Sequence, residues 1–115
     1  MITETEDYKI TTLIEEKTAS IEGTLRLQSP NAYTQPFESL TDALGKVDNL
    51  TINIAKLNFL NSSGISSFAT LILLAKQNDV LLTINCNKNI PWQVKTTNSF
   101  TQLYPKLTIN FIEED

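Results

Sequence analysis

Strand-like and helix-like segments alternate along most of this chain, and that alternation is the strongest constraint on its fold. Three short apolar segments rich in β-branched residues have the character of strands: LTINIAK at 50–56, VLLTINC at 80–86 and LTINFI at 107–112. The second is almost continuously apolar, which is typical of a strand covered on both faces. Strands separated by helices are joined by right-handed crossovers and lie parallel. The sequence therefore predicts an α/β fold, with a mainly parallel sheet and helices packed against it.

The N-terminal part of the chain predicts a β-hairpin. In residues 8–16, the side chains of Ile10, Thr12 and Ile14 alternate with those of the opposite face, and residues 20–28 show the same period of two. Strands that follow each other through a short turn pair antiparallel. The expected order is therefore β-β-α-β-α-β-α-β, with the first strand antiparallel at one edge of the sheet.

Three helices are expected between the strands, at about 29–47, 62–77 and 90–104. Ser29 is the expected cap of the first helix, and Pro36 should bend or delay it. Asn89 is the expected cap of the third helix. Trp92 lies at the start of that helix and is expected to pack against the sheet edge, with a role as a partner anchor as the alternative.

Length and composition predict a single domain. With 115 residues, of which 41% are hydrophobic, the chain has the size of one compact unit with one core. No repeat, low-complexity tract or linker divides it. We expect one domain over 1–115, with a folded core at about 8–112 and solvated acidic tails, MITETED at the start and EED at the end.

Charge and missing residue types exclude several kinds of function. The net charge is −4 and the basic residues form no stripe, which argues against a nucleic-acid partner. The chain has no histidine, so it lacks the commonest general base and metal ligand. Its one cysteine, Cys86, is expected to be a structural core residue. We therefore expect no catalytic site, no metal and no cofactor.

The apolar segments and the start of the chain bear on location. The longest apolar run, near FATLILLA, is far shorter than a membrane span, and the start is acidic where a secretory signal is basic and then apolar. The sequence predicts a cytoplasmic protein without a membrane partner.

The segment LNFLNSSGISSF, residues 57–68, changes from a strand pattern to a helix pattern within a few residues. On a helical wheel, one broad side is apolar and is expected to face the core: Ile65, Phe68, Ala69, Ile72, Leu73 and Ala75. The other side is polar, with leucines within it or at its margin: Ser66, Ser67, Thr70, Leu71 and Leu74. An apolar strip within a polar face predicts a docking surface for a partner.

Ser62 and Ser63 fall in the first turn of this helix, where backbone N–H groups have no intrahelical acceptor. A phosphate on Ser62 would meet those donors, and its charge of about −2 would oppose the burial of nearby apolar residues by a partner. The structural alternative is that Asn61 and the serines only cap the helix, and that Gly64 permits close packing or a tight turn.

The residues FLNSSGISSF, within this order of strands and helices, resemble the corresponding part of STAS domains, the fold of bacterial anti-sigma-factor antagonists. The likeness extends over about 8–112, and its specific part is the motif D-S-S-G followed by an apolar residue, which Ser62, Ser63, Gly64 and Ile65 match. In that family the first serine is phosphorylated by a serine kinase that is also the anti-sigma factor. A phosphatase of the PP2C type restores the unmodified form, which binds. The resemblance implies a STAS fold, phosphorylation at Ser62 and these two proteins as partners.

Asn61 stands where that family has an aspartate. A related STAS-like branch carries L-N-T-S-S at this point, with the hydroxyl residue after the asparagine phosphorylated, and its partner is a diguanylate cyclase. The same branch begins its first helix with a motif similar to Pro30-Asn31-Ala32-Tyr33. A regulator of another signalling enzyme, such as a diguanylate cyclase, is therefore the alternative to an anti-sigma-factor antagonist.

The expected site follows from the motif and the resemblance together. Ser62 is the expected phosphorylation site of a non-enzymatic regulatory protein. The partner is expected to contact the start and outer face of the second helix: Asn61, Ser63, Gly64, Ser66, Ser67, Thr70, Leu71 and Leu74. A domain that is never modified and only scaffolds an assembly is the remaining alternative.

Two other functions fail for lack of residues. A serine hydrolase needs a base and a glycine shortly before the nucleophile, whereas this chain has no histidine and has Leu60 or Asn61 at that place. A phosphorylated receiver domain needs an acceptor aspartate at the end of a central strand. The strand pattern before Ser62 ends without an acidic residue.

Overall fold

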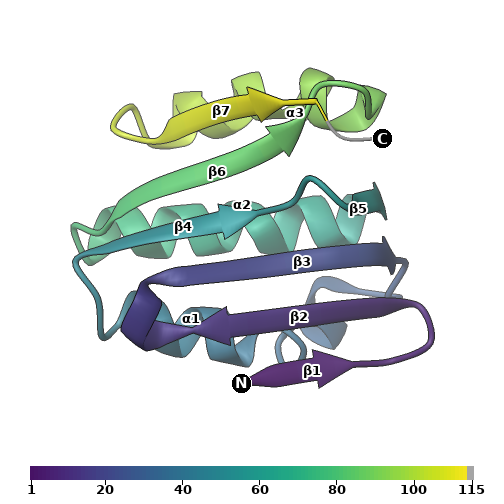
Figure 1. Ribbon diagram of the computed structural model, residues 1–115, viewed down its shortest axis with the longest axis horizontal. Coiled ribbons are helices and arrows are strands. Elements are labelled where there is room, and N and C mark those ends of the chain that lie inside the picture. The colour runs from purple at the N-terminus through teal and green to yellow at the C-terminus, as the bar shows by residue number, and fades with distance from the viewer. Residues whose placement is uncertain (114–115) are drawn as a thin grey trace.

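The computed structural model describes residues 1–113 and arranges them as one sheet with helices beside it (Figure 1). The strands are β1 (Ile2–Glu4), β2 (Tyr8–Leu13), β3 (Thr18–Leu25), β4 (Asn49–Asn53), β5 (Leu57–Leu60), β6 (Leu81–Asn87) and β7 (Thr108–Ile112). The α-helices are α1 (Glu38–Leu44), α2 (Ser62–Gln77) and α3 (Pro91–Leu103), and the 3-10 turns are η1 (Ile14–Glu16) and η2 (Pro30–Tyr33). The expected order is confirmed, with two short strands added, β1 and β5.

The strands of the described residues form a seven-stranded sheet in the order β1-β2-β3-β4-β6-β7, with β5 paired to the end of β3. The first three strands pair antiparallel. The pairs β3 with β4, β4 with β6 and β6 with β7 are parallel. A mainly parallel sheet with an antiparallel N-terminal edge is therefore confirmed.

The acidic N-terminal segment is part of the sheet, which corrects the expected start of the folded core at about residue 8. Ile2 pairs with Thr11 in the β1–β2 ladder, and the N-terminal ammonium donates a hydrogen bond of 2.7 Å to the carbonyl oxygen of Thr12. At the other end, Glu113 forms an ion pair with Lys88. The rest of the expected acidic tail, residues 114 and 115, lies outside the described residues.

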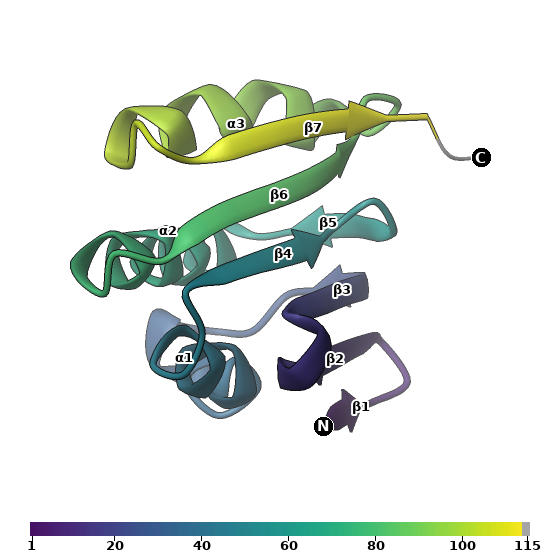
Figure 2. The same cartoon turned by 60° about the vertical axis from the view of Figure 1, so that its left-hand side comes forward.

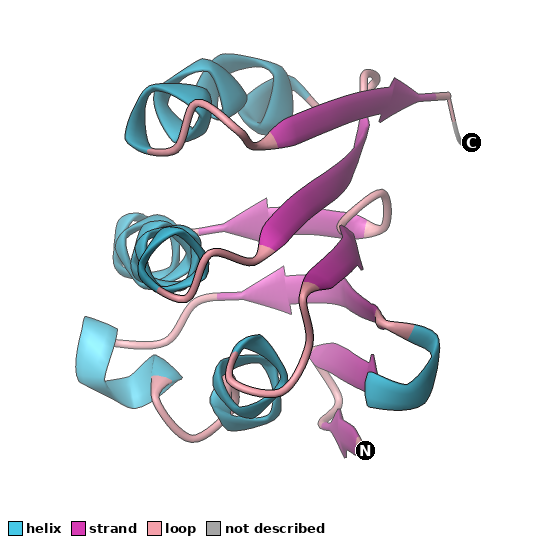
Figure 3. Ribbon diagram, turned by 90° about the vertical axis from the view of Figure 1, so that its left-hand side faces the viewer, coloured by secondary structure: helices cyan, strands magenta, loops and turns pink. Residues whose placement is uncertain are grey.

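The three α-helices of the described residues lie on one side of the sheet (Figures 2 and 3). The expectation that 80–86 is covered on both faces is therefore wrong. Leu82, Ile84 and Cys86 are buried under the helices, whereas Leu81 is 56% exposed on the open side. The next two side chains on the open side, Thr83 and Asn85, are polar. The alternation of apolar and polar residues was therefore present in the sequence, but Leu81 at the start of the strand concealed it.

The first helical segment is divided, as Pro36 predicted. Ser29 caps the short turn η2, accepting a hydrogen bond of 3.3 Å from the backbone N–H of Ala32. The chain then turns through Pro36, and α1 begins at Glu38. Because η2 and α1 are separate, η2 is free to lie against the start of α2, and this contact builds the site described below.

The third helix begins without the expected cap. Ile90 is the N-cap residue of α3 and makes no side-chain capping bond, while the backbone N–H of Asn89 donates to the Asn87 side-chain oxygen at 2.9 Å. Trp92 is partly buried against the core, and its indole N–H donates to the carbonyl oxygens of Leu57 and Asn58, both at 3.2 Å. The preferred packing role of Trp92 is confirmed.

The core lies between the sheet and the helices. The inward side chains of β4 and the turn after it, Leu50, Ile52 and Ile54, are buried as the alternation predicted. Cys86 is fully buried, and burial raises the pKa of its thiol to about 12, so it is a structural residue as expected. No helix in the described part of the chain is long and apolar enough to cross a membrane.

Candidate functional site

The candidate site lies where β3, β5 and the start of α2 meet, at the carboxyl ends of the parallel strands (Figure 1). Gly23 allows β3 to change partner from β4 to β5. Its φ is +98°, and a Cβ there would lie 2.2 Å from the carbonyl oxygen of Asp7. Beyond it, Leu25 pairs with Leu60, and the backbone N–H of Asn61 donates to the carbonyl oxygen of Leu25 at 3.1 Å. The N-cap residue of α2 is thereby attached directly to the end of β3.

Asn61 caps α2 and also ties the helix to two other segments. Its side-chain oxygen accepts hydrogen bonds from the backbone N–H of Gly64 at 2.9 Å and from the Tyr33 hydroxyl at 2.6 Å. Its amide nitrogen donates to the carbonyl oxygen of Leu27 at 2.8 Å. An aspartate could accept the first two bonds but would place a carboxylate oxygen against the Leu27 carbonyl. This contact is a structural reason for asparagine at the position where the STAS signature has aspartate.

Tyr33 completes this network from η2. Its side chain is buried, and desolvation raises the pKa of its hydroxyl above the ordinary value, so the hydroxyl stays protonated and donates to Asn61. The same hydroxyl oxygen accepts a hydrogen bond of 3.3 Å from the backbone N–H of Leu27. The short turn η2, the segment after β3 and the start of α2 are thus held by one set of hydrogen bonds.

Gly64 is required for packing inside the protein. A Cβ at this position would lie 2.2 Å from Leu60 Cδ1 and 2.7 Å from the Tyr33 hydroxyl oxygen. The glycine is buried and its φ is not positive, so neither exposure to a partner nor an unusual backbone conformation accounts for it. The buried Gly64 therefore fits the close-packing alternative rather than the expected contact with a partner.

Ser62 is exposed in the first turn of α2, whereas Ser63 is half-buried. The side-chain oxygen of Asn61 accepts a hydrogen bond from the backbone N–H of Gly64, and its carbonyl oxygen accepts one from the backbone N–H of Ile65. Within residues 1–113, the Ser62 hydroxyl makes no hydrogen bond, and the backbone N–H groups of Ser62 and Ser63 have no acceptor. A hydroxyl that is open to solvent lies beside two unused donors.

On the polar side of α2, the serines and the threonine are as exposed as expected, but the leucines are more buried than expected. Ser66 and Thr70 are exposed and Ser67 is half-exposed, as predicted, but Leu71 is only 4% exposed and belongs to the core. Leu74 is partly buried against that core, so neither leucine forms an exposed apolar strip. Conversely, Leu73 was expected in the core and is 44% exposed.

The reason for this difference is that α1 covers the flank of α2 that carries Leu71. The side chain of Asn78, just after α2, donates a hydrogen bond of 3.0 Å to the Leu44 carbonyl at the end of α1. The two helices therefore lie against each other. A wheel of α2 alone shows that the helix has two apolar flanks, but not that a neighbouring helix covers one of them.

A shallow groove of about 300 Å³ lies between α2 and the segment from η2 to α1. Its lining combines hydroxyl groups with apolar surface: Pro30, Asn31, Tyr33, Thr34, Phe37, Thr41, Ser67, Thr70 and Leu71. The Ser67 hydroxyl donates to the Pro30 carbonyl at 3.4 Å across the groove. Three of the residues expected to contact a partner therefore line one groove, and Leu71 contributes to its floor rather than to an exposed strip.

Sequence reasoning missed a second feature of this region. Phe59 on β5 is 40% exposed, and the guanidinium carbon of Arg26 lies 5.0 Å from the centre of its ring. Arg26 directly follows β3 and is the only arginine in the chain, which was the available signal. A cation and an aromatic ring thus lie at the same end of the sheet as Ser62.

Comparisons with known proteins identify the fold. No protein-family model matches the chain, and no curated protein sequence matches it. Among solved structures, a chain in the crystal structure of the diguanylate cyclase SiaD in complex with its activator SiaC from Pseudomonas aeruginosa is similar. The TM-score is 0.72 and the identity 14%, over 97% of this chain and 99% of that one.

A structure of SiaC from Pseudomonas aeruginosa is similar as well, with a TM-score of 0.67 and 15% identity, over 98% of this chain and 94% of that one. Similarity at this level of identity shows a shared fold. The chain has the STAS-like α/β fold of these SiaC structures, with a seven-stranded sheet and three helices in its described residues.

Proposed function

We propose that this chain is a non-enzymatic regulatory protein that binds and controls a signalling enzyme of the diguanylate cyclase class. The support is the similarity of the fold, over nearly the whole of both chains, to structures of SiaC, which is described as the activator of the diguanylate cyclase SiaD. The Asn61 cap, which differs from the usual STAS aspartate, is consistent with this choice. The comparisons favour a cyclase regulator over the anti-sigma-factor antagonist expected first from the sequence.

The proposed binding surface is the start of α2 with its exposed side and the adjoining groove. Ser62, Ser66 and Thr70 are exposed there, and Ser67 and Thr70 line the groove. Asn61, Gly64 and Leu71 act from inside the protein by fixing the shape of this surface. A surface of hydroxyl groups around a partly apolar groove can be buried by a partner without the desolvation of a charge.

The proposed regulation is phosphorylation of Ser62. Exposure of its hydroxyl supports this assignment, since a kinase needs access to the oxygen, and the neighbouring unused N–H groups favour an anion. A phosphate of about −2 charge at the edge of the binding surface would have to be desolvated by the partner, which lowers affinity. A serine kinase would supply the phosphoryl group from ATP, and a phosphatase of the PP2C type would remove it.

Anti-sigma-factor antagonism is the second candidate, favoured by the match of Ser62, Ser63, Gly64 and Ile65 to the STAS motif. The two candidates differ in the partner. Affinity capture from the native host with the unmodified protein should retain a cyclase under the first proposal and an ATPase-type anti-sigma factor under the second. Equal capture of the same proteins by Ser62→Ala and Ser62→Asp would instead indicate an unmodified scaffold.

Intact-mass measurement tests the modification itself. Protein purified from its native host should carry one phosphoryl group that phosphatase treatment removes, and fragmentation should locate it at Ser62. Ser66→Ala is the matched control, because Ser66 is also exposed on α2 and should not change the phosphate content. Unmodified protein under every growth condition would refute regulation at Ser62.

A further inference from the structure

We propose that Arg26 is the counter-ion that binds the phosphate when Ser62 is phosphorylated. This inference deepens the proposed function and rests on it. Arg26 is the only arginine among the nine basic residues of a chain whose net charge is −4. Its guanidinium is the group best suited to two parallel hydrogen bonds with a phosphate.

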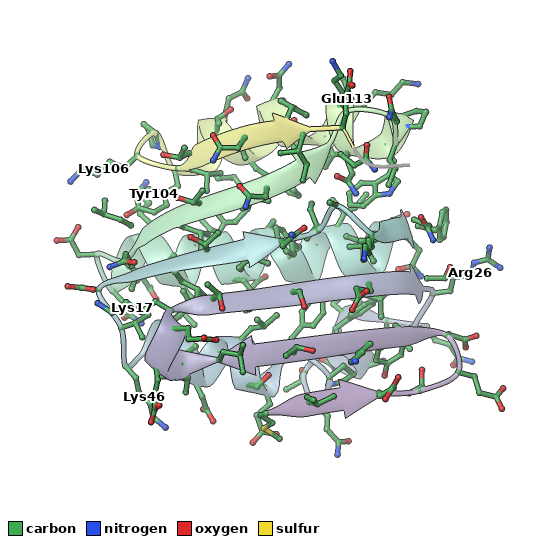
Figure 4. All side chains as sticks on the ribbon, viewed as in Figure 1. Lys17, Arg26, Lys46, Tyr104, Lys106 and Glu113 are labelled. Atoms are coloured by element: carbon green, nitrogen blue, oxygen red, sulfur yellow. The ribbon has the colours of Figure 1, made fainter. Side chains whose placement is uncertain are left out.

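Backbone pairing places Arg26 next to the start of α2. Thr24 pairs with Phe59 and Leu25 with Leu60, and the backbone N–H of Asn61 donates to the Leu25 carbonyl oxygen at 3.1 Å as part of this last pair. Arg26 follows directly on this pair, and the carbonyl oxygen of Leu27, the residue after it, accepts a hydrogen bond of 2.8 Å from the side chain of Asn61. Ser62 is the next residue, and the long Arg26 side chain extends from the same end of the sheet (Figure 4).

The Arg26 side chain forms no ion pair with a carboxylate of the described residues. The ion pairs within residues 1–113 are Lys17 with Asp48 and Lys88 with Glu113, and Arg26 makes neither an ion pair nor a hydrogen bond with a described residue. Arg26 lines a small hollow with Asp7, Tyr8, Thr24 and Leu27, and its guanidinium carbon lies 5.0 Å from the centre of the Phe59 ring. Such a contact at an exposed site is weak, about 0.5–1 kcal/mol, and leaves the N–H donors free to bind an anion.

Pairing with the phosphate gives the modification a second consequence. As the guanidinium turns toward Ser62, it leaves the face of Phe59, so both the charge and the aromatic surface at this end of the sheet change. Lys56 provides a matched comparison, because it is an exposed cation in the turn before β5 and lies in a hollow with Glu22.

The second pKa of phosphoserine, followed by ³¹P NMR during a pH titration, tests the pairing directly. Phosphoserine is placed at position 62 during translation, in the full chain and in the Arg26→Gln, Arg26→Lys and Lys56→Gln variants. The pKa should be lower with Arg26 than with Arg26→Gln by about half a unit or more, because a nearby opposite charge favours the dianion. Arg26→Lys should retain part of the lowering, and Lys56→Gln should retain all of it.

Phosphoserine at position 66 is the control for a general charge effect, since Ser66 is also exposed on α2. Its pKa should be the same with Arg26 and with Arg26→Gln. An equal pKa for phosphoserine-62 in these two proteins, or an equal change at position 66, would overturn the pairing. Because the phosphate is installed without a kinase or partner, the pairing and the proposed function fail in separate experiments.

Discussion

The hydroxyl of Tyr33 donates a hydrogen bond of 2.6 Å to the side-chain oxygen of Asn61, and this bond joins η2 to the cap of α2. The two residues are 28 positions apart in the sequence. Through this hydrogen bond, η2, which forms one wall of the groove, helps to fix the position of Ser62. The position of the candidate switch therefore depends on the Asn61 network as much as on the helix itself.

Replacing Tyr33 by phenylalanine should weaken this connection. The side-chain oxygen of Asn61 then loses the hydrogen bond from the Tyr33 hydroxyl, and the backbone N–H of Leu27 loses its acceptor. The free energy of unfolding should fall by about 1–2 kcal/mol. Urea denaturation monitored by circular dichroism measures this loss of stability. Tyr8→Phe is the control, because the Tyr8 hydroxyl makes no hydrogen bond within the described residues, and an equal loss in both variants would contradict this role for Tyr33.

Asn61→Asp should destabilise the protein although aspartate is the usual residue of the STAS motif. The variant loses the bond from the amide nitrogen to Leu27 and brings two oxygen atoms together, at a cost of about 1 kcal/mol or more. The same substitution at Asn58, which is exposed on β5 three residues earlier, should have little effect. A thermal midpoint for Asn61→Asp equal to that of the parent protein would show that the Leu27 contact is unimportant.

Gly64→Ala should be strongly destabilising, whereas Gly45→Ala should not. The added Cβ at Gly64 would overlap Leu60 and Tyr33 at 2.2 and 2.7 Å, whereas at Gly45 the nearest atom lies 3.5 Å away. Overpacking of this kind costs about 1–3 kcal/mol. Paired denaturation curves test this prediction, and similar stability of the two variants would mean that the start of α2 can move away from η2 at little cost.

The two faces of α2 can be distinguished with Leu71→Ala and Leu73→Ala. Leu71 is buried, so its truncation should cost about 2–5 kcal/mol, while truncation of the exposed Leu73 should cost far less. The opposite ranking in denaturant titrations would mean that the helix is rotated relative to the arrangement described above.

Much of the fold was predictable because its signals are local. The alternating segments predicted a mainly parallel sheet, and the Asn61–Ser62 sequence predicted the start of α2, because short polar side chains satisfy the free N–H groups of a first turn. Pro36 likewise indicated where the first helical segment divides. In each case the responsible side chain lies within a few residues of its effect.

The site was harder to predict because its contacts join distant segments. The bond from Asn61 to Leu27 spans 34 residues, and no local pattern indicates it. The burial of Leu71 depends on α1, and a wheel of one helix does not show which flank a second helix covers. The contact between Arg26 and Phe59 likewise depends on the exchange of strand partners at Gly23.

The most direct test of the account is a binding titration of the unmodified chain and its phosphoserine-62 form against the diguanylate cyclase of the same cell. The unmodified protein should bind and change the rate at which the cyclase consumes GTP. The phosphorylated protein should bind at least about tenfold more weakly, which corresponds to about 1.4 kcal/mol. Equal affinity of the two forms, or no binding by either, would contradict the proposal that Ser62 controls a cyclase-binding surface.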